Sequence, residues 1–385
     1  MSRKGKRSFD ERYKVDLTRD KKEAEALKKI ASFDRKLQAN TFKNVRKHDD
    51  LIVHIRENQY GDRRVVQVQF KTLGCNMKRA GSCWNCNYGV VDQCLITPNQ
   101  YKRAFQKELK RIAGNVLVLE SLGSITDPNE FNPKVFSDIM KMAVEDGKFN
   151  TILIETHLTQ ISQQLVEEIA TMNKNKKHIG FEIGMEDMNL ENRKLIHKMG
   201  IQNQQLTELY AMLQKYGMSL GINLIYGFPF MSEQERIDSV VNSVKTISRN
   251  LPEAEIVLFL MSVKENTIME HMRTSGMYQP ANPWGLVEVT KQILSNDDFK
   301  NLITFSWFGE KEDPYIKEET CYSCEDCKNL IVSFFRKMNG TFDWQARKSL
   351  LMELFEHEKD LVCGCYENFK EQLKEDDGKN PRYEI

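Results

Sequence analysis

The stretch KTLGCNMKRAGSCWNCNYG, residues 71–89, decides how the rest of the sequence is interpreted. It holds three cysteines, Cys75, Cys83 and Cys86, separated by seven and then by two residues. Glycine, asparagine and serine are too frequent here for a helix or strand interior, so we expect a loop. Three soft thiolates on one loop suit an iron-sulfur cluster, and with three ligands one iron of a four-iron cluster stays open to a small chelating molecule.

Strands and helices alternate on both sides of this loop. Residues 65–70 alternate apolar and polar side chains and lead the chain into it as a strand. Further strands are expected at 115–120, 151–155, 179–184, 219–226 and 255–263, with helices at 98–113, 133–144, 161–172, 203–216 and 232–250. Six such strands predict a parallel sheet, either doubly wound or a whole or partial barrel. In both, functional groups lie at the carboxyl ends of the strands.

The composition is that of a globular protein. The chain has 385 residues, of which 40% are hydrophobic and 29% charged. No apolar run approaches the ~20 residues of a membrane span, and the N-terminus is charged where a signal peptide is apolar. We therefore expect a cytoplasmic protein without a membrane partner.

The N-terminal lead-in is basic. Residues 1–50 contain sixteen lysines and arginines against nine acidic residues, although the formal net charge of the whole chain is only +1. Such an arm is compatible with binding along a phosphate backbone, as in transfer RNA. A solvated, partly helical segment explains it equally well, because 21–36 has helical spacing of apolar residues.

A second group of cysteines lies near the C-terminus. The chain has nine cysteines, and in the cytosol such clusters indicate metal ligands before disulfides. Cys94 is interpreted as a small buried hydrophobic residue. The second group predicts either a structural zinc site or an auxiliary iron-sulfur cluster, and its spacing does not separate the two. Its members are Cys321, Cys324, Cys327, Cys363 and Cys365.

These motifs, in this order, resemble the radical S-adenosylmethionine (SAM) superfamily. The usual spacing there is three residues and then two, whereas this chain has seven and then two. The cysteine motif of this chain, with its longer first gap followed by Cys-x-x-Cys-x-Tyr, resembles the motif of one branch of the superfamily. That branch includes the Elongator catalytic subunit and the archaeosine-forming enzymes. Gly123-Ser124, the run 183–187 and the run 223–233 are similar to later motifs of that branch. The resemblance covers roughly residues 65–270.

The resemblance implies a partial (β/α)6 barrel of the TIM type, with a [4Fe-4S] cluster on Cys75, Cys83 and Cys86. S-adenosyl-L-methionine would occupy the open iron, and flavodoxin or ferredoxin would supply the electron. Trp84 and Tyr88 would shield the cluster, or simply pack in the loop. The remaining residues implied for SAM binding are Gly123, Ser124, Glu182, Gly184, Glu186 and Asn223. Three of them, Glu182, Glu186 and Asn223, could instead cap helices.

Glu155 and His157 follow the third strand and are candidates for substrate contact or proton transfer. Archaeosine-forming relatives act on a lysine-bearing 7-deazaguanine in transfer RNA and leave an amidine. Two alternatives stay open: a radical SAM enzyme acting on a small molecule or peptide, and a non-catalytic, zinc-stabilised protein that binds nucleic acid.

Four segments are expected along the chain. A basic lead-in covers residues 1–60 and a radical SAM barrel residues 61–280. A cysteine-rich helical extension follows at 281–374, and a polar tail at 375–385 ends the chain.

Overall fold

The main sheet of the protein has eight strands in the order β1-β2-β3-β4-β5-β6-β7-β9, which is also their order along the chain. β1 and β2 are antiparallel, and every later pair is parallel. The strands are β1 (Val53–Tyr60), β2 (Arg63–Phe70), β3 (Val116–Ser121), β4 (Thr151–Glu155), β5 (His178–Glu186), β6 (Ser219–Tyr226), β7 (Glu255–Leu260) and β9 (Ile303–Ser306). A separate ribbon pairs β8 (Val263–Lys264) with β10 (Glu318–Glu319).

This computed structural model describes residues 29–30, 32–34, 36–37, 52–88, 96–198, 200–296, 299, 301–306, 318–319 and 324–376. Two of the cysteines considered above, Cys94 and Cys321, lie outside these residues, as do most of the lead-in and residues 377–385.

The strand order distinguishes between the two expected architectures. A doubly wound sheet reverses its strand order at a switch point, whereas here each strand is added on the same side of the last one. Residues of β1, β2, β3, β4, β5, β7 and β9 line one common cavity, so the sheet curls around it. The expected partial barrel is confirmed. β9, from residues expected in the C-terminal extension, forms its last strand.

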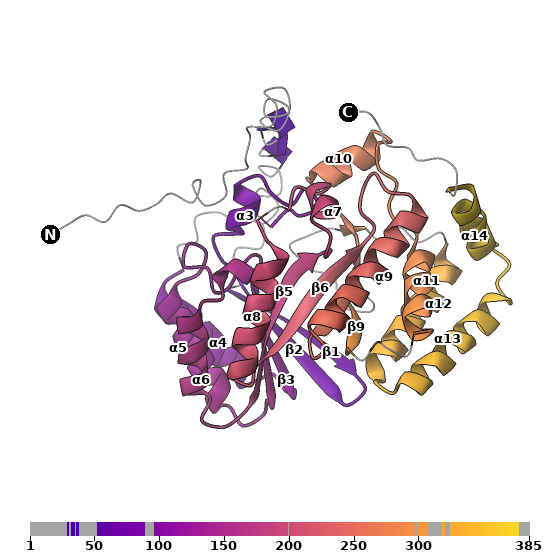
Figure 1. Cartoon of the computed structure of the whole chain (residues 1–385). Helices are drawn as coiled ribbons and strands as arrows, with labels where there is room; N and C mark the ends of the chain where they lie inside the picture. Colours follow the sequence, from indigo (N-terminus) through magenta and orange to yellow (C-terminus); the bar gives the residue numbers. More distant parts are fainter. Residues whose placement is uncertain are drawn as a thin grey trace.

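Helices cover the outside of the curled sheet (Figure 1). Those between successive strands are α4 (Pro98–Leu109), α5 (Pro133–Glu145), α6 (Gln163–Met172), α8 (Asn203–Lys215), α9 (Glu233–Asn250) and α11 (Pro283–Leu294). Shorter ones are α3 (Asn76–Arg79), α7 (Leu190–Lys194), α10 (Ile268–Thr274) and the 3-10 turn η2 (Leu158–Gln160). The extension contributes α12 (Glu325–Gly340), α13 (Trp344–Glu358) and α14 (Cys365–Asp376). None of the helices in the described residues is both long and apolar enough to cross a membrane.

Local sequence explains most of these boundaries. Ser232 and Glu235 form the expected capping box at the start of α9. Thr97 caps α4 in the same way, and this helix ends at Leu109, a few residues before the expected end. All six residues of β3 are buried, as expected for a strand covered on both faces.

β1 was not expected from the sequence. Its residues, VHIRENQY, carry too few apolar side chains to stand out as a strand. A signal was present at the turn, because Gly61-Asp62 is a pair typical of two-residue hairpins and Gly61 has a φ of +57°. β1 is polar because part of its inner face borders the cavity, to which Arg56 and Tyr60 contribute.

Gly285 provides a test of the packing between α11 and the sheet. A Cβ at this position would overlap the ring of Tyr226, which is 1% exposed. We expect Gly285→Ala to lower the free energy of unfolding by about 1–3 kcal/mol through overpacking. The matched control is Gly147→Ala, where an added Cβ meets nothing within 4 Å. Urea unfolding of both variants checks this, and equal midpoints would contradict it.

Candidate functional site

The cysteine loop begins directly after β2, at the carboxyl end of the parallel strands. Its two ends are joined by a hydrogen bond from the Cys75 N–H to the Tyr88 carbonyl, at 2.8 Å. A tight turn inside it brings the Cys86 N–H within 3.0 Å of the Cys83 carbonyl. The three cysteines therefore belong to one closed loop, as the spacing indicated.

A distant segment holds the middle of this loop. Cys83 and Trp84 donate backbone hydrogen bonds to the carbonyls of His197 and Ile196, at 3.3 and 2.9 Å. The Trp84 ring stacks on the His197 ring, with centroids 5.5 Å apart. These contacts fix Cys83 in the left-handed region, at a φ of +57°, which a residue with a side chain seldom adopts.

The thiols of Cys75 and Cys83 are enclosed by protein. Burial raises the pKa of Cys75 well above its usual value, and the neighbouring charges of Glu130, Cys83 and Cys86 raise it further. Burial also raises the pKa of Cys83 to about 11. Thiols that are costly to ionise in isolation suit a positively charged, thiophilic group such as an iron-sulfur cluster.

Glu130 joins the cysteine loop to the end of β3. Its two carboxylate oxygens accept hydrogen bonds from the backbone N–H groups of Asn76 and Ser124, both at 2.6 Å. Burial raises the pKa of this carboxyl group to about 7. A Cβ on Gly123 would lie 2.8 Å from the Cys75 Cα, so only glycine allows this close approach. Glu130 could not be identified from the sequence, because no local motif surrounds it.

Ser124 lies at the junction between the ends of β3 and β4. Its hydroxyl accepts a hydrogen bond from the His157 N–H at 3.2 Å and shares another with Thr156. The His157 ring caps η2, with Nδ1 2.8 Å from the Thr159 hydroxyl. Burial and the nearby charge of Lys198 lower the pKa of His157 to about 3, so the imidazole is neutral. Its role in catalysis stays a prediction.

Gly184 and Glu186 flank an irregularity in the pairing of β5 with β6. Glu186 adopts a φ of +67° and forms a buried ion pair with Lys198. Burial lowers the pKa of the Lys198 ammonium, but the charges of Glu186 and Cys83 outweigh it, so the pKa is raised. A Cβ on Gly184 would lie 2.8 Å from the Glu186 carboxylate, so this glycine makes room for the pair. Lys198 was missed from the sequence.

Asn223 lies on β6 opposite Gly184. It is 6% exposed, and its Oδ1 is buried without a hydrogen-bond partner among the described residues. An orphaned acceptor of this kind is costly unless a ligand satisfies it. Asn223 therefore fits the expected ligand contact.

A cavity of about 150 Å³ lies inside the curled sheet. Tyr88 and Ser121 line it next to the cysteine loop, and the Tyr88 ring is covered by the Lys264 ammonium, 4.2 Å from the ring centroid. Four glutamates and two arginines also line it: Glu120, Glu155, Glu182, Glu255, Arg56 and Arg63.

Three of the cavity glutamates, Glu120, Glu155 and Glu182, influence one another electrostatically. Arg56 forms an ion pair with Glu120. Burial raises the pKa of Glu155 well above its usual range, and the nearby carboxylates of Glu120 and Glu182 raise it further. The structure thus brings together three carboxyl groups from the successive strands β3, β4 and β5. Two of these groups, Glu155 and Glu182, were candidates from the sequence.

The described residues of the lead-in that precede β1 contact the cysteine loop through Asp34. Asp34 and Lys78 form an ion pair at 2.8 Å in which both side chains are 0% exposed. The same ammonium donates to the Cys83 carbonyl at 3.1 Å. The lead-in is helical at residues 29–30, 32–34 and 36–37, in agreement with the interpretation of a partly helical segment. That interpretation also expected a solvated segment, whereas Asp34 is buried.

The second cysteine group assembles at the starts of α12 and α14, in the helical extension seen beside the barrel in Figure 1. The four described cysteines, Cys324, Cys327, Cys363 and Cys365, come together there. The fifth expected member, Cys321, lies outside the described residues.

Comparisons with known proteins agree with these motifs. The chain is 26% identical to archaeosine synthase subunit beta of Methanosarcina acetivorans over 288 residues, which cover 72% of this chain and 79% of that protein. It is 22% identical to the same subunit of Thermococcus kodakarensis, over 71% of this chain and 92% of that protein. No family model matches the chain.

Among solved structures, the archaeal Methanocaldococcus infernus Elp3 with an N-terminal deletion aligns at a TM-score of 0.47 and 13% identity. That alignment covers 74% of this chain and 65% of the other. The two sequence relatives confirm the resemblance to the archaeosine-forming enzymes.

The buried pair under the cysteine loop predicts an asymmetric response to substitution. Lys78→Met removes the ammonium group that faces the buried Asp34 carboxylate, and we expect a loss of about 3–5 kcal/mol of unfolding free energy. The double variant Asp34→Leu/Lys78→Met should recover part of this loss. Thermal and urea unfolding measure both.

The control for this test is Lys194→Met, which removes a solvent-exposed pair with Glu191. We expect it to change the unfolding free energy by less than about 1 kcal/mol. A Lys78→Met variant as stable as this control would contradict the prediction.

Proposed function

We propose that this protein is a radical SAM enzyme whose cluster is held by Cys75, Cys83 and Cys86. The supporting observation is that these three cysteines lie on one closed loop, with a glycine turn against Cys75 and an orphaned asparagine oxygen on β6. When bound, a [4Fe-4S] cluster and S-adenosyl-L-methionine would supply a 5'-deoxyadenosyl radical after reduction by one electron.

The chain's own residues would bind and orient the cofactor. Gly123 leaves space next to Cys75, and Asn223 offers an unsatisfied acceptor. We propose that four further residues complete the SAM site: Ser124, Glu182, Gly184 and Glu186. The ion pair with Lys198 would fix the position of the Glu186 side chain there. Tyr88 and Trp84 would exclude water from the cluster, which strengthens electrostatic interactions inside the site.

We propose a lysine-bearing 7-deazaguanine in transfer RNA as the substrate, converted to an amidine by a lyase reaction. Both sequence relatives are named archaeosine synthase subunit beta. The cavity also supports this choice, since its carboxyl groups outnumber its arginines and an entering ammonium group could replace the proton on Glu155. Glu155 is the proposed contact for that ammonium, and His157, whose ring is neutral, is a candidate for proton transfer.

Since the relatives are named as subunits, we propose that the chain works with a second subunit. The proposed reduction of the cluster calls for an electron donor, for which we propose flavodoxin or ferredoxin. A cytoplasmic location is proposed from the sequence alone. The barrel would carry the reaction: the expected segment 61–280, together with β1 from the expected lead-in at 1–60 and β9 from the expected extension at 281–374. The part of the lead-in before β1 would help to bind transfer RNA. The helices of the extension and the tail at 375–385 would serve as appendages.

The radical SAM proposal is tested by product formation. Anaerobically reconstituted protein with dithionite and SAM should release 5'-deoxyadenosine, and Cys83→Ala should reduce this to background because the cluster loses a ligand. Cys94→Ala, a cysteine without a proposed ligand role, is the matched control and should keep the activity. Equal product from the Cys83→Ala variant would refute the proposal.

The substrate proposal is tested with Glu155→Gln, which keeps the shape but has no proton that an ammonium group can replace. We expect KM for transfer RNA carrying the lysine-bearing base to rise about 10- to 100-fold, the value of a hydrogen bond between charged groups. Formation of 5'-deoxyadenosine without substrate should stay at the wild-type level. The control is Glu253→Gln, at an exposed site outside the cavity.

An unchanged KM in Glu155→Gln would count against the ammonium contact. The alternative substrates are distinguished by gel shift, because binding of transfer RNA should fall steeply with salt. Absence of binding at low salt would favour a small molecule or peptide. A colourless protein that retains zinc but forms no 5'-deoxyadenosine would favour the non-catalytic alternative.

A further inference from the structure

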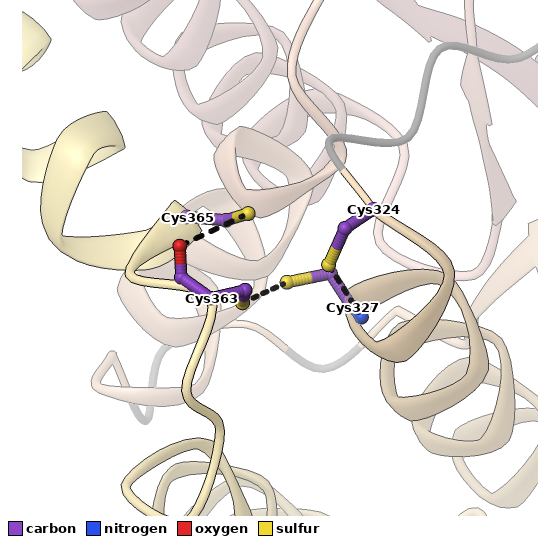
Figure 2. A group of neighbouring side chains, drawn as sticks. All are labelled: Cys324, Cys327, Cys363 and Cys365. Carbon is purple, nitrogen blue, oxygen red and sulfur yellow. Dashed lines mark hydrogen bonds between the residues drawn. The ribbon is translucent and has the colours of Figure 1, made fainter.

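Four cysteine sulfurs meet where the helical extension packs on the barrel (Figure 2). Cys324 and Cys327 come from the start of α12, and Cys363 and Cys365 from the turn before α14 and its first residue. All four are free thiols. Their Sγ atoms all lie within 4.8 Å of one another, and those of Cys327 and Cys363 are 3.5 Å apart.

These distances distinguish one metal ion from a cluster. Four thiolates around a tetrahedral zinc ion, with Zn–S bonds of about 2.3 Å, place their sulfurs about 3.8 Å apart. A four-iron cube holds each thiolate on a different corner, so its ligand sulfurs lie much further apart. The observed spacing is already close to that of a single ion, and Cys321 is not needed to complete the ligand set.

Two helix N-termini and an indole N–H lie around the sulfurs. Cys324 is the N-cap of the sixteen-residue α12, and its sulfur accepts a hydrogen bond from the Cys327 N–H at 3.4 Å. Cys365 begins α14, so the positive ends of two helices meet at the site. The Trp284 indole N–H is buried without a standard hydrogen bond among the described residues and lies beside the Cys327 sulfur.

We propose that Cys324, Cys327, Cys363 and Cys365 bind one structural zinc ion in a closed tetrahedral site. The four ligands bind as thiolates, so metal binding releases their protons, and no position is left open for substrate. The Trp284 N–H would then donate to the Cys327 thiolate as an outer-shell contact. This site is separate from the proposed SAM site and does not depend on it.

The ion would fasten the extension to the barrel. The Trp284 ring of α11 packs on the Tyr366 ring of α14, with centroids 4.7 Å apart, and the Tyr366 hydroxyl donates to Glu288 of α11. Tyr366 directly follows a ligand, so loss of the metal would release the start of α14 from α11. Zinc binding is therefore coupled to the docking of the last helix.

Metal analysis of the full chain, purified and reconstituted anaerobically, tests the proposal. We expect about one zinc per chain, with four sulfur neighbours at about 2.3 Å by X-ray absorption at the zinc edge. Cobalt(II) substitution should give the visible absorption of a tetrahedral tetrathiolate site. Cys363→Ser should lose zinc but keep the iron bound at the cysteine loop, whereas Cys83→Ser should lose iron but keep zinc.

The variant Cys365→His controls for the possibility that Cys363→Ser loses zinc because it misfolds. Histidine is also a zinc ligand, so Cys365→His should retain zinc. A zinc chelator should raise the rate of proteolysis between α13 and α14 in the wild type and leave Cys363→Ser unchanged. Three results would overturn the proposal: iron in place of zinc at these cysteines, a non-reduced mass that reveals a disulfide among them, or zinc retained in Cys363→Ser.

Discussion

One carboxylate determines how close the cysteine loop comes to the barrel. Glu130 accepts hydrogen bonds from the backbone of Asn76 in the loop and of Ser124 after β3. The loop has little regular structure of its own, so its shape depends on such contacts from outside. Gly123 completes the arrangement because it has no side chain to hold the two segments apart.

Charges of opposite sign are separated across the site. Two buried ammonium groups, Lys78 and Lys198, lie around the cysteine loop, each paired with a carboxylate. Carboxyl groups collect in the cavity inside the sheet, where the nearby charges of Glu120 and Glu182 help to keep the Glu155 proton in place. A buried ion pair contributes little net stability, so these pairs serve mainly to position the loop.

The strands with continuous apolar runs could be predicted from the sequence. β4 and β6 have the expected bounds because each is apolar along most of its length and ends at turn residues. The cysteine loop and the second cysteine group were predicted from spacing, because ligand spacing is local. β1 could not be predicted because Val53 and Ile55 are the only apolar residues on the face that turns away from the cavity, where Glu57 and Gln59 follow them. Glu130, Lys198 and Asp34 could not be found, since their partners are distant in sequence and meet only in the folded chain.

The contacts of Cys83 and Trp84 with His197 and Ile196 have a consequence for the order of events during synthesis. The cysteines leave the ribosome well before the segment that encloses them, which follows β5. At typical translation rates, this delay is on the order of ten seconds. Throughout that interval the loop that carries the three thiols would lack these contacts, so a metal centre of the kind proposed above would be easiest to insert before the barrel closes over the loop.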